Sequence, residues 1–194
     1  MVVDPRDIKI PAYIATILGL CALILACIGI GTPAWQIVYS DAPNNTSPFT
    51  STNFYYTCYA GNASCTNYPY STDDYIHLRL ASGLGIVGIL FLTFGIIGTY
   101  ILGLYPFIGP AKFQDSRYYD LYVLSGPFCL FIATITMLAA LAEGSQTVLY
   151  NGYSANLYQT AHVISIFVLL GSAYASGRRS LISSSGMEPL LNNK

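Results

Sequence analysis

Four long apolar runs alternate with polar connectors along the chain. The runs cover residues 12–31, 79–104, 121–142 and 157–177. A helix needs roughly 20 apolar residues to cross the ~30 Å hydrocarbon core of a bilayer, and each run is long enough. The pattern therefore predicts a single membrane domain of four helices that occupies the whole of residues 1–194.

The basic residues predict how these helices are oriented. Seven of the eight lie outside the runs, and four membrane crossings would place all seven on the same side. They are Arg6, Lys9, Lys112, Arg117, Arg178, Arg179 and Lys194. Basic residues of short loops stay on the cytoplasmic side. We therefore expect both chain ends (1–11 and 178–194) and the middle connector 105–120 to be cytoplasmic. The connectors 32–78 and 143–156 are then outside the cell.

The first run also admits a second interpretation. Arg6 and Lys9 precede it, and small residues follow at Gly29 and Gly31, which is the arrangement of a secretory signal. The apolar part of such a signal usually has about 7–15 residues, and this run is longer. We favour a membrane span, and cleavage would leave the topology of the remaining chain unchanged.

The composition agrees with a membrane protein. Hydrophobic residues make up 54% of the chain and charged residues 9%, with a mean hydropathy of +0.52. A soluble domain is about a quarter charged, so much of this surface faces something other than water. The net charge is -1 and no basic stripe is present, which gives no reason to expect nucleic acid as a partner.

The outside connector 32–78 has the pattern of a small β-structure. Strand-forming residues occupy 34–39 and 54–59, and the segment 41–51 between them is rich in turn formers. In the second outside connector, residues 148–150 have the composition of one further short strand. The Ser-rich stretch 180–194 predicts no regular structure.

Two of the five cysteines lie in the first outside connector. Cys58 and Cys65 flank Gly61-Asn62, a tight-turn signal that predicts a hairpin. Cysteines outside the cell are expected to pair, and a disulfide across so short a loop stabilises by roughly 2–3 kcal/mol in the chain-entropy model. The other three, Cys21, Cys27 and Cys129, lie in apolar runs, where a thiol behaves as a small hydrophobe.

Polar groups in this connector suggest two surface properties. Asn44, Asn45 and Asn62 each begin a glycan acceptor pattern, and the tight turn at Asn62 makes the first two the favoured positions. The acidic residues Asp41, Asp73 and Asp74 would favour cations if they lined a pore.

Three ionisable residues lie near the outer ends of the runs. Arg79 is either an interfacial anchor, with its head group among lipid head groups, or a fixed partner for Asp73 or Asp74. Glu143 and His162 either pair with each other or lie separately at head-group level.

Catalytic and cofactor patterns are missing from the sequence. No Ser/His/Asp set, phosphate-binding glycine loop or zinc spacing occurs, and the apolar runs are almost free of charge. We therefore expect no enzyme activity, no metal and no cofactor.

The first connector resembles the claudin and peripheral-myelin-protein superfamily. Trp35 corresponds to the first Trp of its signature, Asn53-Phe54-Tyr55 to Gly-Leu-Trp, and Cys58 and Cys65 to the cysteine pair. Arg79 lies where claudins keep an Arg at the outer start of the second helix. The chain departs from that pattern in the substituted Gly-Leu-Trp, in having only six residues between the cysteines, and in lacking an evident PDZ-binding tail.

The resemblance implies a left-handed four-helix bundle in the plasma membrane with an outside sheet of about five strands, one of them from the second connector. Trp35, Phe54 and Tyr55 would anchor the sheet at the outer edge of the bilayer. The implied function is a structural protein of cell–cell contacts. It would associate with copies of itself within one membrane, and with same-family proteins on the opposing cell, into a paracellular barrier or cation-favouring pore. Alternatives within the superfamily are an auxiliary channel or receptor subunit and a peripheral-myelin-type membrane organiser.

Overall fold

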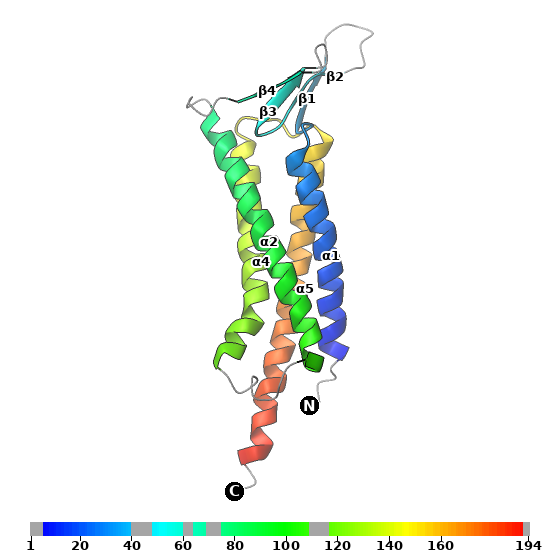
Figure 1. The fold of residues 1–194 in the computed structure, drawn as a ribbon, viewed down its shortest axis with the longest axis vertical. Helices are drawn as coiled ribbons and strands as arrows, with labels where there is room; N and C mark the ends of the chain where they lie inside the picture. The colour runs from blue at the N-terminus through cyan, green and yellow to red at the C-terminus, as the bar shows by residue number, and fades with distance from the viewer. Residues whose placement is uncertain (1–5, 40–47, 60–63, 69–74, 109–116, 192–194) are drawn as a thin grey trace.

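The computed structural model describes residues 6–39, 48–59, 64–68, 75–108 and 117–191. Four long helices form a bundle (Figure 1): α1 (Arg6–Gly31), α2 (Ile76–Ile108), α4 (Arg117–Gly144) and α5 (Tyr153–Leu191). All four are long and apolar enough to span a membrane. Consecutive helices run in opposite directions, so α1 begins and α5 ends at the same end of the bundle.

Small residues allow the helices to pack closely. α2 packs most extensively on α4 and α1 on α5, and contacts between these two pairs close the ring. At the α2–α4 interface, a Cβ added to Gly98 would lie 3.0 Å from the Cα of Gly126. In the centre of the bundle, the hydroxyl groups of Thr99 and Ser172 lie 2.7 Å apart and satisfy each other. Such interfaces, built from small and hydroxyl residues, are typical of helices in lipid.

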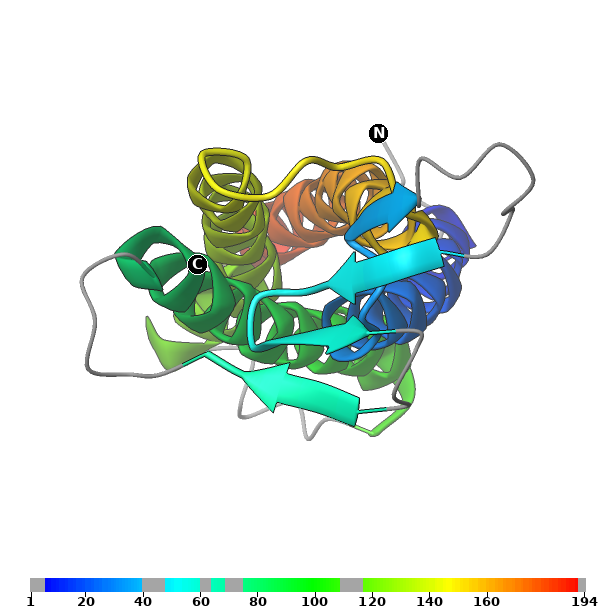
Figure 2. The ribbon, with the colours of Figure 1, turned by 90° about the horizontal axis from the view of Figure 1, so that it is seen from above.

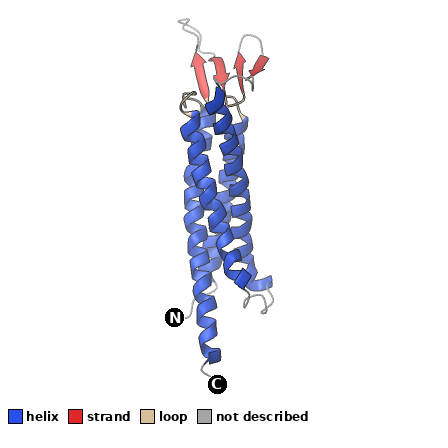
Figure 3. Cartoon of the chain, turned by 90° about the vertical axis from the view of Figure 1, so that its left-hand side faces the viewer, coloured by secondary structure: helices blue, strands red, loops and turns tan. Residues whose placement is uncertain are grey.

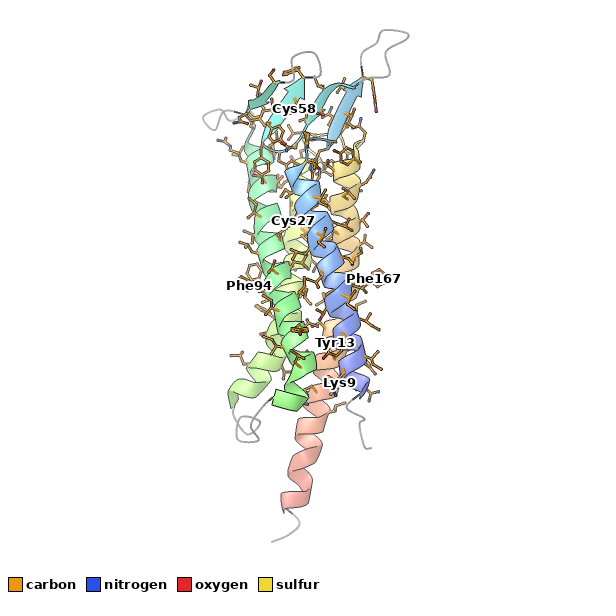
Figure 4. The ribbon with its side chains drawn as sticks, turned by 45° about the vertical axis from the view of Figure 1, so that its right-hand side comes forward. Lys9, Tyr13, Cys27, Cys58, Phe94 and Phe167 are labelled. Carbon is orange, nitrogen blue, oxygen red and sulfur yellow. A yellow bond between two sulfur atoms is a disulfide. The ribbon has the colours of Figure 1, made fainter. Side chains whose placement is uncertain are left out.

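Large apolar side chains cover the outside of the bundle. Phe94 on α2 is 61% exposed and Phe167 on α5 is 60% exposed, and both project away from the helices (Figure 4). Helices that are apolar on every face are stable only when a second apolar medium meets the outer face. The bundle therefore has an apolar outer surface, suited to contact with lipid, around a tightly packed interior.

A four-stranded antiparallel sheet stands at one end of the bundle (Figure 3). Its strands follow one another in space as in sequence: β1 (Gln36–Tyr39), β2 (Pro48–Thr52), β3 (Tyr56–Tyr59) and β4 (Ser64–Asn67). Seen from above, β1 lies near the ends of α1 and α5, and β4 lies on the side of α2 (Figure 2). We call this end of the molecule the sheet end.

The structure corrects several expectations from the sequence. Strand β2 lies within and just beyond the segment 41–51 that was expected to be a turn-rich break. Residues 148–150 form no strand, so the described sheet has four strands rather than five. Helix α5 continues to Leu191 through most of the stretch that was expected to lack regular structure.

Candidate interaction surface at the sheet end

Trp35 joins the sheet to the helices from inside the protein. Its side chain is fully buried, and its Nε1 donates a hydrogen bond of 2.7 Å to the carbonyl of Gly29 at the end of α1. Three other rings surround the indole, with centroid distances of 4.2 Å to Phe54, 5.3 Å to Tyr150 and 5.5 Å to Tyr158. The expectation that Trp35 and Phe54 anchor the sheet in the lipid interface is wrong in its mechanism, because both are buried in protein.

Tyr150 contributes to the same cluster from the second connector. Its hydroxyl donates to the Leu141 carbonyl near the end of α4. Burial raises the pKa of Tyr150. The direction of this shift favours the protonated hydroxyl, which is the form that donates the hydrogen bond.

A tight turn at Asn53 places Phe54 under the sheet. The Asn53 Oδ1 accepts hydrogen bonds from the backbone amides of Tyr55, at 2.8 Å, and Tyr56, at 2.9 Å. Asparagine stabilises turns in this way because its side chain replaces a backbone acceptor. Its Nδ2 has no hydrogen-bond partner among the described residues, so the oxygen is the end of the side chain that holds the turn.

The predicted hairpin and disulfide are confirmed. Cys58 and Cys65 lie directly opposite each other on β3 and β4, with their Cα atoms 4.0 Å apart, and their sulfur atoms are bonded. Tyr68 donates its backbone N–H to Tyr55 across the same pair of strands. Because hydrogen-bonded and non-bonded pairs alternate in an antiparallel ladder, the two cysteines form a non-bonded pair, where side chains come closest.

The second connector closes the outer edge of β1 without forming a strand. The side-chain amide of Asn151 accepts a hydrogen bond from the Ile37 N–H at 2.8 Å and donates one to the Ile37 carbonyl at 2.9 Å. One carboxamide thus occupies both edge groups of Ile37, as a neighbouring strand would. This side chain is the physical reason that the sheet needs no fifth strand at this position.

Further contacts join the start of β1 to the start of α5. The Gly152 N–H donates to the Trp35 carbonyl at 2.9 Å, and the Ser154 N–H donates to the Ala34 carbonyl at 3.0 Å. The Ser154 hydroxyl also lies 2.6 Å from that of Thr32. Together with Asn151, these residues fix β1 to the bundle.

Among the described residues, no strand pairs with the opposite edge of the sheet. All four residues of β4 are exposed, and β4 is the last strand in the described sheet. Since Tyr68 pairs with Tyr55, alternation along the ladder turns the backbone groups of Cys65 and Asn67 away from β3. An open edge of this kind presents unpaired N–H and C=O groups to another chain.

One acidic residue at this end has a partner that the sequence did not indicate. Glu143 pairs with His77 at the start of α2, with 2.9 Å between Oε2 and Nδ1, rather than with His162. Arg79 lies in the first turn of α2 beside a group of tyrosines. The pairing of His77 with Glu143 joins the start of α2 to the end of its neighbour α4.

Several predicted positions lie outside the described residues. They are the glycan acceptor positions Asn44, Asn45 and Asn62 and the acidic positions Asp41, Asp73 and Asp74. Where the chain is described, no group of three His, Cys, Asp or Glu side chains is placed to hold a metal ion.

The residues that fix the second connector to the sheet could not be recognised from the sequence. Asn151 and Gly152 were visible only as a turn signal and Tyr150 as part of an expected strand. Ser154 was an ordinary residue of the second connector, and Tyr158 an ordinary residue of the fourth run. Hydrogen bonds between residues more than one hundred positions apart leave no local pattern in a sequence. Only the Asn-Gly dipeptide marks the position at which the two connectors meet.

The sheet end and the helices together define a class of protein. The described part of the chain has four helices long and apolar enough to span a membrane, with a disulfide-bonded sheet at one end of them. No protein-family model matches the chain, and no curated protein matches it.

Proposed function

We propose that this chain is a claudin-like structural protein of cell–cell contacts. In this proposal its left-handed bundle lies in the plasma membrane, with both ends in the cytoplasm and the sheet outside the cell. It acts without enzyme chemistry or a cofactor, through contacts between sheets. Copies associate side by side within one membrane and meet same-family proteins of the opposing cell, which makes a paracellular barrier or a cation-favouring pore.

One observation carries the proposal: the sheet has one closed edge and one open edge. Asn151 and Gly152 occupy the edge of β1 through hydrogen bonds to Ile37 and Trp35. All four residues of β4, at the other edge of the described sheet, are exposed, and the disulfide joins β4 to β3. A short, covalently fixed strand with a free ladder is suited to pair with a strand of another copy.

The orientation outside the cell is supported by the chemistry of the cysteines and of the charges. A disulfide persists in an oxidising compartment, and Cys58–Cys65 lies in the sheet. Five of the six basic residues in the described helices lie toward the other end, where α1 begins and α5 ends, and Arg79 is the exception. The strands themselves contain no acidic or basic residue, so a cation preference would come from Asp41, Asp73 and Asp74.

The test uses a proline that blocks the open edge alone. In Asn67→Pro, the N–H that points away from β3 is removed, and proline is tolerated at such a position of an edge strand. We expect the variant to reach the surface of junction-free cells with its disulfide intact, and to lose enrichment at cell–cell contacts. The matched control Asn67→Ala changes the same side chain, keeps the N–H, and should keep both the enrichment and any rise in transepithelial resistance.

Two results would contradict the proposal. Equal contact enrichment for Asn67→Pro and the unaltered chain would show that the β4 edge does not mediate association. Absence of contact enrichment for the unaltered chain, together with co-purification of a large channel or receptor, would favour an auxiliary subunit instead.

A further inference from the structure

The second connector carries the only Asn-Gly pair in the chain, at Asn151 and Gly152. The connector passes beside β1 at the sheet end (Figure 2), and both residues of the pair are needed there. The Asn151 carboxamide occupies the N–H and the carbonyl of Ile37, at 2.8 and 2.9 Å. Gly152 lies so close to Ala34 that a Cβ would overlap the Ala34 carbonyl. The contact between the two connectors therefore uses an asparagine that a glycine follows directly.

An asparagine followed by a glycine is prone to deamidation. The backbone nitrogen of the glycine gives up its proton and attacks the Cγ of the asparagine, and no Cβ hinders this approach. A bond forms between that nitrogen and Cγ, the bond from Cγ to Nδ2 breaks, and the side-chain nitrogen leaves with the proton as ammonia. Water then opens the five-membered imide ring at either carbonyl and leaves an aspartate or an isoaspartate. The net reaction consumes water and changes no oxidation state.

Both reacting groups are occupied in the folded sheet end. The Gly152 N–H donates to the Trp35 carbonyl at 2.9 Å, and the Asn151 carboxamide is held against Ile37 by its two hydrogen bonds. The attack requires the Gly152 nitrogen to lose its proton and the carboxamide to turn toward that nitrogen. Because neither set of hydrogen bonds survives this step, the reaction proceeds from a state in which the second connector has detached locally from β1.

The product cannot restore the contact with β1. An aspartate at position 151 has a carboxylate, which accepts hydrogen bonds but has no hydrogen to donate to the Ile37 carbonyl. An isoaspartate inserts an additional methylene into the backbone and displaces the Gly152 N–H from the Trp35 carbonyl. With either product, the edge of β1 presents unpaired backbone groups.

We propose that Asn151 is a deamidation site whose reaction is restrained by the contact between the second connector and β1. Detachment of the connector releases the Asn-Gly pair, and deamidation then makes the opening of the β1 edge permanent. This modification does not depend on the proposed role at cell contacts, because it rests on contacts within a single chain.

Mass spectrometry of the full chain measures the reaction. The chain is purified in a maltoside detergent and kept at neutral pH in oxygen-labelled water, and uptake of label into the fragment that contains Asn151 is followed with time. The same chain, reduced and denatured in urea, gives the unrestrained rate. We expect Asn151 to deamidate at least about tenfold more slowly in the folded chain, because its hydrogen bonds must break first. Asn53 also binds two backbone amides but precedes Phe54, and it should take up little label in either state.

Two matched variants leave the Asn-Gly pair itself unchanged. The Ser154 hydroxyl lies 2.6 Å from that of Thr32 and accepts the Ala34 N–H at 3.1 Å. Ser154→Ala should therefore loosen the connector and speed deamidation at least about fivefold. In the control Ser165→Ala, the lost hydroxyl binds the His162 carbonyl of its own helix, and the rate should stay unchanged. An intact disulfide and unchanged elution confirm that each variant is folded.

The variant Asn151→Asp reproduces one product directly. We expect a protease to cut the first connector of this variant at least about fivefold faster than that of the unaltered chain. Three results would overturn the proposal. They are equal deamidation rates in the folded and the denatured chain, an unchanged rate in folded Ser154→Ala, and unaltered proteolysis of Asn151→Asp. If Ser154→Ala does not fold, the first and third results decide the test without it.

Discussion

A single glycine decides whether the two connectors at the sheet end can touch. Gly152 donates its N–H to the Trp35 carbonyl, and a Cβ at this position would overlap the carbonyl of Ala34. Gly83, on the outer face of α2, has no atom within 4 Å of the position where its Cβ would lie. The sequence does not distinguish these two glycines, but the fold leaves room for a side chain at Gly83 and none at Gly152.

Gly152→Ala is therefore expected to destabilise the protein strongly. The added methyl group meets backbone rather than a flexible side chain, which places the cost at the upper end of ~1–3 kcal/mol for overpacking. The apparent midpoint of thermal unfolding in detergent should fall clearly. Gly83→Ala is the control and should leave the midpoint unchanged or slightly higher. Equal midpoints for both variants would show that the close approach at Gly152 is not required.

At the scale of elements, the edge of β1 is closed by a side chain instead of a strand. Asn151 satisfies both the N–H and the carbonyl of Ile37. At the far edge, β4 pairs with β3 on one side, where the disulfide also joins them, and with no described strand on the other. The two edges of the described sheet therefore differ. One edge is hydrogen-bonded to the second connector of the bundle, and the other is suited to pair with a strand of another chain.

Asn151→Ala should weaken the attachment of β1 to the bundle. Two hydrogen bonds near the surface are lost, at about 0.5–1.5 kcal/mol each. Limited proteolysis of the detergent-solubilised protein should then cut within the first connector faster than in the unaltered chain. The control Asn156→Ala, on the exposed side of α5, should be cut at the unaltered rate. Protection equal to that of the unaltered chain in Asn151→Ala would show that the remaining contacts suffice.

At the scale of the whole molecule, exposed apolar residues face two different environments. Phe167 lies on the outer face of α5 between the ends of the bundle (Figure 4) and is 60% exposed. Leu149 is 67% exposed, and lies in the second connector at the sheet end. Exposure alone does not distinguish them, but if the four candidate spans cross a membrane, the first residue faces lipid and the second faces water.

Arginine substitution should separate the two environments. A charge at the centre of a membrane helix costs about 2.5–3.5 kcal/mol on insertion scales. Phe167→Arg should therefore reduce insertion of the fourth span in a glycosylation-reporter assay, and Leu149→Arg should leave it unchanged. Equal insertion of both variants would contradict a lipid-facing position for Phe167.

Much of the architecture could be predicted from local patterns. The four spans follow from apolar length, because a bilayer sets the number of residues that a helix needs. The Cys58–Cys65 hairpin follows from two cysteines around a Gly-Asn turn. Strand β2 could not be predicted, because its five residues include Pro48 and form a strand only between two neighbours.

The sequence by itself determined the parts whose physics is local: the length of each span, the side on which basic residues gather and the short disulfide loop. Tertiary structure alone decided that Trp35 is buried among rings from three segments, that Glu143 pairs with His77, and that Asn151 replaces a fifth strand. Each of these depends on groups far apart in the chain, whose meeting is set by how the helices pack. Close packing depends on the shape of the whole interface between helices, and no short stretch of sequence determines that shape.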